Sequence, residues 1–84
     1  MKLTVTIKTI FKTPDLPLKA TTNVLINDCF VIRNVKLIDN GSGPFISMPS
    51  YKDKNGVWRS VCYPITSECR MQIQDAVIAA YNEA

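Results

Sequence analysis

Histidine is absent from this chain of 84 residues, so the side chain most often used as a metal ligand and as a general acid or base is missing. Cysteine is scarce as well. Cys29, Cys62 and Cys69 form no C-x-x-C pair, and an odd number of thiols cannot all pair within one chain. We therefore expect the thiols to stay reduced, as in a cytoplasmic protein, and we expect neither a metal nor a cofactor.

Catalytic signatures are also lacking. The chain contains serine and cysteine nucleophiles, but it has no histidine to activate them and no S-x-x-K arrangement. The seven acidic residues are scattered, mostly at predicted turns, where aspartate is common for conformational reasons. The sequence therefore predicts a protein that is not an enzyme and has no small-molecule substrate.

Long apolar runs are missing too. No run approaches the roughly 20 residues that a membrane-spanning helix needs. The first ten residues, MKLTVTIKTI, alternate polar with apolar side chains and include Lys8, unlike the apolar segment of a signal peptide. We therefore expect a protein that does not enter a membrane.

The length predicts a single domain over residues 1–84. Apolar residues make up 46% of the chain and charged residues 20%, which is typical of a folded domain and not of a disordered one. A chain this short buries a small share of its surface, so association with a second copy would supplement its stability. The net charge of +3 is too small to identify a partner, and the position of the cations matters more.

Alternation of polar and apolar residues predicts five short strands. Between them lie turn-forming residues: two prolines within residues 13–17, the pair Asn27-Asp28, a glycine-containing segment at residues 39–44, and the pair Asn55-Gly56. Pro49 interrupts the fourth strand, which must be short or lie at an edge there. The expected strands cover residues 2–8, 18–26, 29–38, 45–52 and 57–63.

After Pro64 the apolar spacing changes to that of an amphipathic helix, carried by Ile73, Ala76, Val77, Ala80 and Tyr81. Thr66 or Ser67 can cap its start. Met71 and Ile78 fall on the far side of the helix, exposed or in contact with a partner. The sequence thus predicts an α+β fold, in which a small antiparallel sheet of hairpin-connected strands is covered by one C-terminal α-helix.

The first predicted hairpin suggests an interface. A two-residue turn at Asn27-Asp28 places Ile26 opposite Cys29 and puts most apolar side chains on one face. On the other face this register brings together Leu25, Phe30 and Ile32 near the turn. Such a patch is covered by another element or by a second protein chain, and we interpret these residues as a candidate dimer interface.

The second predicted hairpin gathers three cations, Lys52, Lys54 and Arg59, against one carboxylate, Asp53. A two-residue Asn55-Gly56 turn places Lys52 directly opposite Arg59, and a four-residue turn makes them diagonal neighbours on the same face. Like charges so placed repel, and an anion such as phosphate would relieve the repulsion. The alternative interpretation is that these cations only keep a sheet edge soluble.

Three further residues bear on this hairpin. Trp58 and Tyr51 could stack on nucleobases, but the predicted registers place them on the face opposite Lys52 and Arg59. Arg70, near the start of the helix, either covers the core with its stem or extends the basic surface. The candidate nucleic-acid-binding residues are therefore Lys52, Lys54, Arg59 and Arg70.

Several short motifs occur together in a specific order: FV at Phe30, VKLID at Val35, F-x-x-MPS at Phe45, NG-x-x-R ending at Arg59, PI at residues 64–65, and R-x-x-IQDAV at residues 70–77. Over residues 30–81 their order and spacing resemble the bacterial SpoVG family, the stage V sporulation protein G or septation proteins. The N-terminal third matches only as a strand, a loop and a strand.

The resemblance implies a small cytoplasmic protein that forms a homodimer through its sheet. It implies binding to DNA, and for some members to RNA, and a regulatory role linked to gene expression, septation or sporulation. The family's contact positions correspond to Tyr51, Lys52 and Arg59, and Arg70 matches an arginine at the helix start. Tyr51 stands where a cation is common and Lys54 where proline is common. The alternative is a protein-interaction module in cell division that does not bind nucleic acid.

Overall fold

The expected α+β fold class is confirmed by a computed structural model, which describes residues 1–13 and 15–84. Pro14, part of the loop predicted at residues 13–17, lies outside the described residues. The elements are β1 (Leu3–Ile10), β2 (Leu18–Ile26), β3 (Phe30–Asp39), β4 (Pro44–Ser47), β5 (Ser50–Lys52), β6 (Trp58–Ser60) and α1 (Ser67–Glu83).

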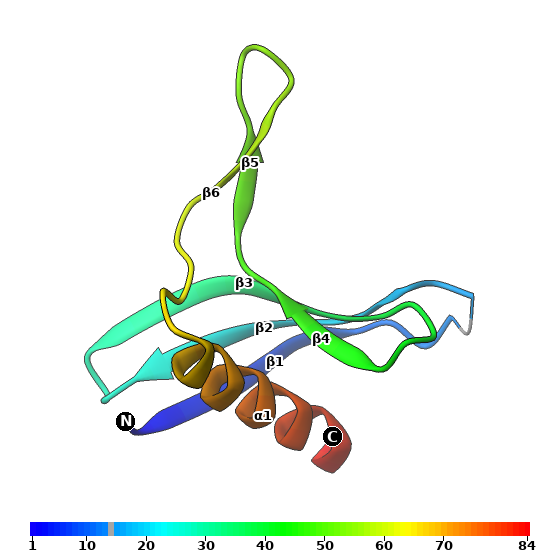
Figure 1. Cartoon of the computed structure of the whole chain (residues 1–84). Helices are drawn as coiled ribbons and strands as arrows, with labels where there is room; N and C mark the ends of the chain where they lie inside the picture. The colour runs from blue at the N-terminus through cyan, green and yellow to red at the C-terminus, as the bar shows by residue number, and fades with distance from the viewer. Residues whose placement is uncertain (14) are drawn as a thin grey trace.

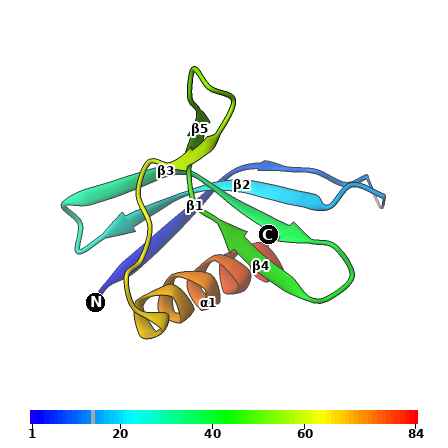
Figure 2. The same cartoon turned by 45° about the horizontal axis from the view of Figure 1, so that its top comes forward.

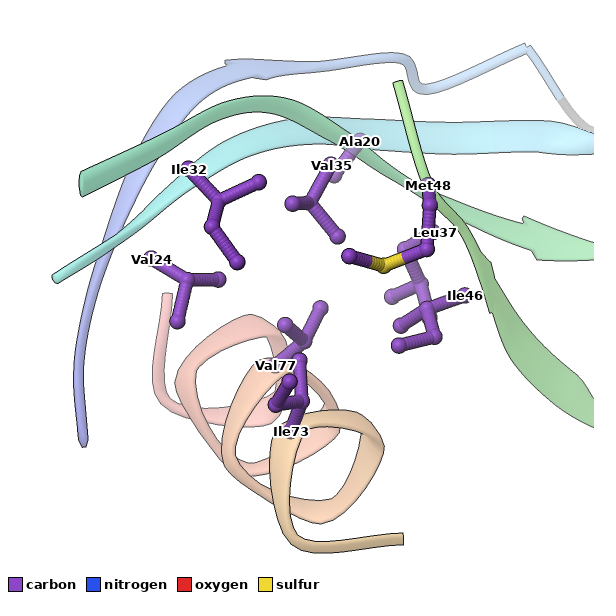
Figure 3. Packing of buried hydrophobic residues seen from close by; sticks show 9 residues of the cluster. All are labelled: Ala20, Val24, Ile32, Val35, Leu37, Ile46, Met48, Ile73 and Val77. Atoms are coloured by element: carbon purple, nitrogen blue, oxygen red, sulfur yellow. The ribbon is translucent and has the colours of Figure 1, made fainter. Parts of the chain in front are cut away.

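The first four strands form an antiparallel sheet in the order β1-β2-β3-β4, and α1 covers one face of it (Figure 1). Alternating side chains from the strands meet the helix and form the core. In Figure 3, Ile73 and Val77 of α1 point towards the face of the sheet that carries Val24, Ile32 and Leu37. The buried apolar residues are Ala20, Val24, Ile32, Val35, Leu37, Ile46, Met48, Ile73 and Val77.

The β2–β3 turn differs from the prediction. Asn27 and Asp28 adopt positive φ, 51° and 57°, as the turn interpretation required. The turn contains three residues instead of two, however, because Ile26 pairs with Phe30. Cys29 completes it by donating its N–H to the Ile26 carbonyl at 3.1 Å.

A bulge in β3 then changes which side chains face the core. Val24 pairs with Ile32 but Thr22 pairs with Val35, so β3 has one extra residue there, and Asn34 has φ 62°. As a result both Ile32 and Val35 are buried. The prediction that Val31 and Arg33 line the core is wrong, since both are exposed.

The helix begins as predicted. Thr66 is the N-cap, and its side-chain oxygen accepts a hydrogen bond from the Cys69 N–H at 3.1 Å. Met71 is exposed, whereas Ile78 packs against the core, so the prediction that Ile78 lies on the far side is wrong. Within residues 1–13 and 15–84, no helix is long and apolar enough to cross a membrane.

Candidate nucleic-acid interface

The second hairpin leaves the sheet and forms an arm, residues 50–60, which comprises β5, β6 and their loop. It projects from the sheet on the side away from α1 (Figures 1 and 2). The strand predicted over residues 45–52 is split: Met48 is anchored in the core, Pro49 breaks the ladder, and β5 starts at Ser50. The Val61 N–H donates to the Pro49 carbonyl at 2.8 Å and closes the foot of the arm. Every residue of β5 and β6 is exposed.

The register of the arm contradicts both predicted registers. Tyr51 pairs with Arg59, and Lys52 pairs with Trp58. Residues directly opposite in an antiparallel pair share a face, and successive residues alternate between faces. Lys52 and Arg59 therefore lie on opposite faces, so the prediction that they repel each other on one face is wrong.

Asp53 explains this register because it organises a loop longer than predicted. One carboxylate oxygen, Oδ1, accepts hydrogen bonds from the N–H groups of Asn55 and Val57, both at 2.9 Å. The other, Oδ2, accepts from Nε of Arg59 at 3.1 Å. The turn closes with Gly56, whose φ of 81° favours glycine. From the sequence, Asp53 was expected only to balance charge, and its role in the loop was not predicted.

The electrostatics of the loop follow from the same contacts. The Val57 N–H, the Arg59 guanidinium and, more weakly, the Asn55 N–H hold the pKa of Asp53 below its usual range, against an opposing effect of desolvation. Arg59 is thus already paired with a carboxylate of its own chain. The repulsion that an external anion was expected to relieve is therefore not present at Arg59.

The observed register produces a different surface. Each face of the arm now combines one cation with one aromatic ring, Lys52 with Trp58 and Arg59 with Tyr51. The rings are well exposed, Trp58 at 67% and Tyr51 at 53%. Lys54 adds an exposed cation in the loop. The prediction that the two aromatic residues lie on the face away from Lys52 and Arg59 is therefore wrong.

Arg70 does not lie on the arm. It is half-buried, and its Nη2 donates to the Ile46 carbonyl at 2.8 Å, while Gln74 Oε1 accepts from the Ile46 N–H at 3.4 Å. Ile46 belongs to β4, the edge strand of the sheet. Both helix side chains thus satisfy edge backbone groups that would otherwise be open to another strand. Arg70 therefore has a structural role alongside any role in binding.

A cleft of about 390 Å³ lies between the foot of the arm, the sheet edge and the start of α1. Its walls bring Arg59 and Arg70 together, whereas Lys52 and Lys54 lie outside it. Tyr63, which was not predicted as a site residue, belongs to the lining and is exposed. The lining also includes Phe45, Met48, Trp58 and three serines, Ser47, Ser50 and Ser60.

The three predicted dimer residues do not form one patch. Leu25 pairs with Val31 on the sheet face away from the core, whereas Ile32 is buried in the core. Phe30 is 61% exposed and pairs with Ile26, which packs against the core cluster. The three-residue turn causes this separation, because it shifts Phe30 and Ile32 by one position relative to Leu25. In the part of the chain that the structure describes, no three histidine, cysteine or acidic side chains are grouped as metal ligands would be.

The fold and the site together define a small α+β protein with an exposed basic and aromatic hairpin on a helix-backed sheet. A family model described as SpoVG matches residues 1–83, and the chain belongs to the SpoVG family. The resemblance inferred from the sequence motifs is thereby confirmed.

Curated relatives carry the name "Putative septation protein SpoVG". The protein from Treponema denticola is 40% identical over 70 residues, which cover 83% of this chain and 75% of the relative. The one from Bdellovibrio bacteriovorus is 36% identical over 74 residues, covering 88% and 68%. The one from Staphylococcus carnosus is 38% identical over 66 residues, covering 79% and 62%.

Proposed function

We propose that this protein is a homodimeric, cytoplasmic regulator that binds DNA or RNA through the arm, without catalytic activity of its own. The observation that carries the proposal is the arrangement of the arm, which projects from the body and exposes a cation beside an aromatic ring on each face. The link to septation rests on the name that the relatives carry.

Both components of this surface favour a nucleic acid. Lys52, Lys54 and Arg59 against Asp53 give the arm a net charge of +2, most of the net charge of +3 of the chain. Cations that neutralise phosphates release bound counterions and thereby gain salt-sensitive affinity. Aromatic rings stack on bases of any sequence, at roughly 1–3 kcal/mol per base. Phosphate binding by the cations and stacking by the aromatic rings both occur without a catalysed reaction.

The shape of the arm supports a homodimer. A two-stranded hairpin is marginally stable alone in water, and both strands of this one have exposed side chains. A second copy that covers part of an arm would compensate for this weakness, as expected for a small domain.

The unpaired state of Cys29, Cys62 and Cys69 fits a reducing compartment.

The proposed function is tested by the salt dependence of binding to DNA and RNA pools. Lys52→Gln with Lys54→Gln removes two arm cations, and the matched control, Lys8→Gln with Lys12→Gln, removes two exposed cations elsewhere. If the arm contacts phosphates, the arm variant lowers the slope of log affinity against log salt by about 2, roughly one per lost contact. Equal slopes for the arm variant, the control and the parent would contradict the proposal.

A second candidate function is protein interaction without nucleic acid. It is favoured by a hollow of about 580 Å³ between β3 and the foot of the arm, which is lined in part by exposed apolar residues, Phe30, Val31 and Val61. Phe30→Ser tests it. If the hollow binds a partner or a second copy, this variant loses a complex that persists at high salt, and its mass in solution shows whether that complex was the homodimer.

A further inference from the structure

The cleft at the foot of the arm has the composition of a ligand site. It contains three aromatic residues from three different segments: Phe45 from β4, Trp58 from β6, and Tyr63 from the connection to α1. It contains two arginines, and none of the described residues that line it is acidic. Its volume of about 390 Å³ lies in the range of roughly 300–1,000 Å³ that small-molecule sites occupy.

We propose that this cleft binds one unpaired nucleobase of a single-stranded nucleic acid. The inference rests on the proposed function and adds to it the strandedness of the ligand. A base within a duplex is stacked and paired, so its flat faces are not available to Trp58 or Tyr63. An unpaired base can leave its neighbours and stack on an aromatic wall. Single strands and unpaired loops are therefore the ligand class that fits.

The polar groups of the cleft suit the edge of a base and the phosphate beside it. Arg59 donates a hydrogen bond from Nε to Asp53, and Arg70 donates one from Nη2 to the Ile46 carbonyl. A guanidinium has five N–H donors, so Arg70 retains others for the carbonyl of a base, and Arg59, on the arm face opposite Trp58, retains others for a neighbouring phosphate oxygen. Three serine hydroxyls in the lining can both donate and accept. The cleft thus offers stacking surfaces together with hydrogen-bonding groups.

The other ligand that commonly occupies aromatic grooves is a proline-rich peptide. No acidic residue is among the described lining, and although Arg59 is paired with Asp53 beside the cleft, Arg70 donates to a backbone carbonyl and keeps its charge, which favours a polyanion over such a peptide. Lys52 and Lys54, just outside the cleft on the arm, extend the cationic surface along the path of a continuing strand. Charge complementarity therefore assigns the cleft to nucleic acid.

The test compares three probes with equal numbers of phosphates at one salt concentration. They are an oligothymidylate of about 12 nucleotides, a duplex, and an abasic deoxyribose-phosphate strand. Loss of one stacked base predicts affinity for the abasic strand about 5- to 150-fold lower than for oligothymidylate, with the duplex also weaker.

The outcomes separate the two claims. Equal affinity for oligothymidylate and the abasic strand, or tighter binding of the duplex, would overturn the base-binding inference and leave the proposed function intact. Failure of all three probes to bind overturns both, and binding of a proline-rich peptide in their place would assign the cleft to proteins.

Two variants locate the base. Trp58→Leu and Tyr63→Leu should each lower oligothymidylate affinity towards that of the abasic strand, while abasic binding stays unchanged. Both residues are exposed, so the fold is expected to survive, which circular dichroism checks. Phe11→Leu, an aromatic residue that does not line the cleft, is the matched control and should bind all probes like the parent. If both cleft variants still prefer oligothymidylate to the abasic strand by the same factor as the parent protein, the inference is overturned.

Discussion

Arg59 donates from its Nε to Oδ2 of Asp53 at 3.1 Å, across a loop that the same carboxylate holds together through two backbone N–H groups. This pair sets the register of the arm, and the register in turn places a cation beside an aromatic ring on each face. The hydrogen bonds of one aspartate therefore determine how the candidate binding surface is presented.

Replacing this aspartate should loosen the arm and leave the body intact. In Asp53→Ala the N–H groups of Asn55 and Val57 lose their acceptor, and Arg59 loses its partner. We expect faster amide hydrogen exchange at residues 50–60 and unchanged protection of core amides such as that of Leu37. Uniformly faster exchange over the whole chain would show that the arm is not an independent unit.

Acid should have the same effect on the arm. The pKa of Asp53 is depressed in the folded protein, so its contribution to stability is present above the unfolded value of about 4 and is lost as the pH falls through the folded value. Asp53 stays ionised between pH 5 and 8, so we expect the structure of the arm to be unchanged over that range. Arm resonances followed by nuclear magnetic resonance should broaden only below about pH 4. A change near pH 6 would assign the transition to another group.

The three-residue turn between β2 and β3 makes a prediction about two neighbouring residues of β3. Ile32→Ala removes a core side chain and should lower the free energy of unfolding by about 2–5 kcal/mol. Val31 is 49% exposed on the other face, so Val31→Ala should cost about 1 kcal/mol or less. Urea denaturation measures both. The reverse order would mean that β3 has the register expected from a two-residue turn.

The N-cap of α1 predicts a smaller effect. Thr66→Ala removes the acceptor of the Cys69 N–H and should destabilise the protein by about 1 kcal/mol. Thr66→Ser retains a hydroxyl and serves as the matched control. Thermal unfolding of the three proteins measures the difference, and an unchanged midpoint for Thr66→Ala would show that water replaces the cap at no cost.

Much of this fold could be predicted because periodic apolar patterns carry it. The alternation in residues 3–10 and the helical spacing from Ile73 to Tyr81 place side chains on the core without reference to distant residues. The Thr66 cap is equally local. These local patterns were enough to predict the α+β class, and the order and spacing of the short motifs were enough to predict the family.

The candidate site was harder to predict because its geometry depends on single residues. The third turn residue, Cys29, shifted the start of β3 by one position, which transferred Ile32 to the core and dispersed the predicted dimer patch. Asp53 lengthened the arm loop and separated Lys52 from Arg59. An aspartate two residues before Asn55-Gly56 is a known signal for a side-chain-capped turn, so the loop could have been inferred. Partial burial of Arg70 was one of its two expected placements, but its hydrogen bond to the Ile46 carbonyl of β4 depends on tertiary packing and could not be inferred.

Trp58 allows the most direct test of the central claim, since it is the only tryptophan in the chain and lies on the arm. Its fluorescence should be quenched saturably when single-stranded DNA or RNA is added, with an affinity that falls steeply as salt rises. Lys52→Gln with Lys54→Gln should weaken that response, whereas Lys8→Gln with Lys12→Gln should not. Fluorescence that does not change at saturating nucleic acid, while binding is seen by another method, would show that the arm is not the contact surface.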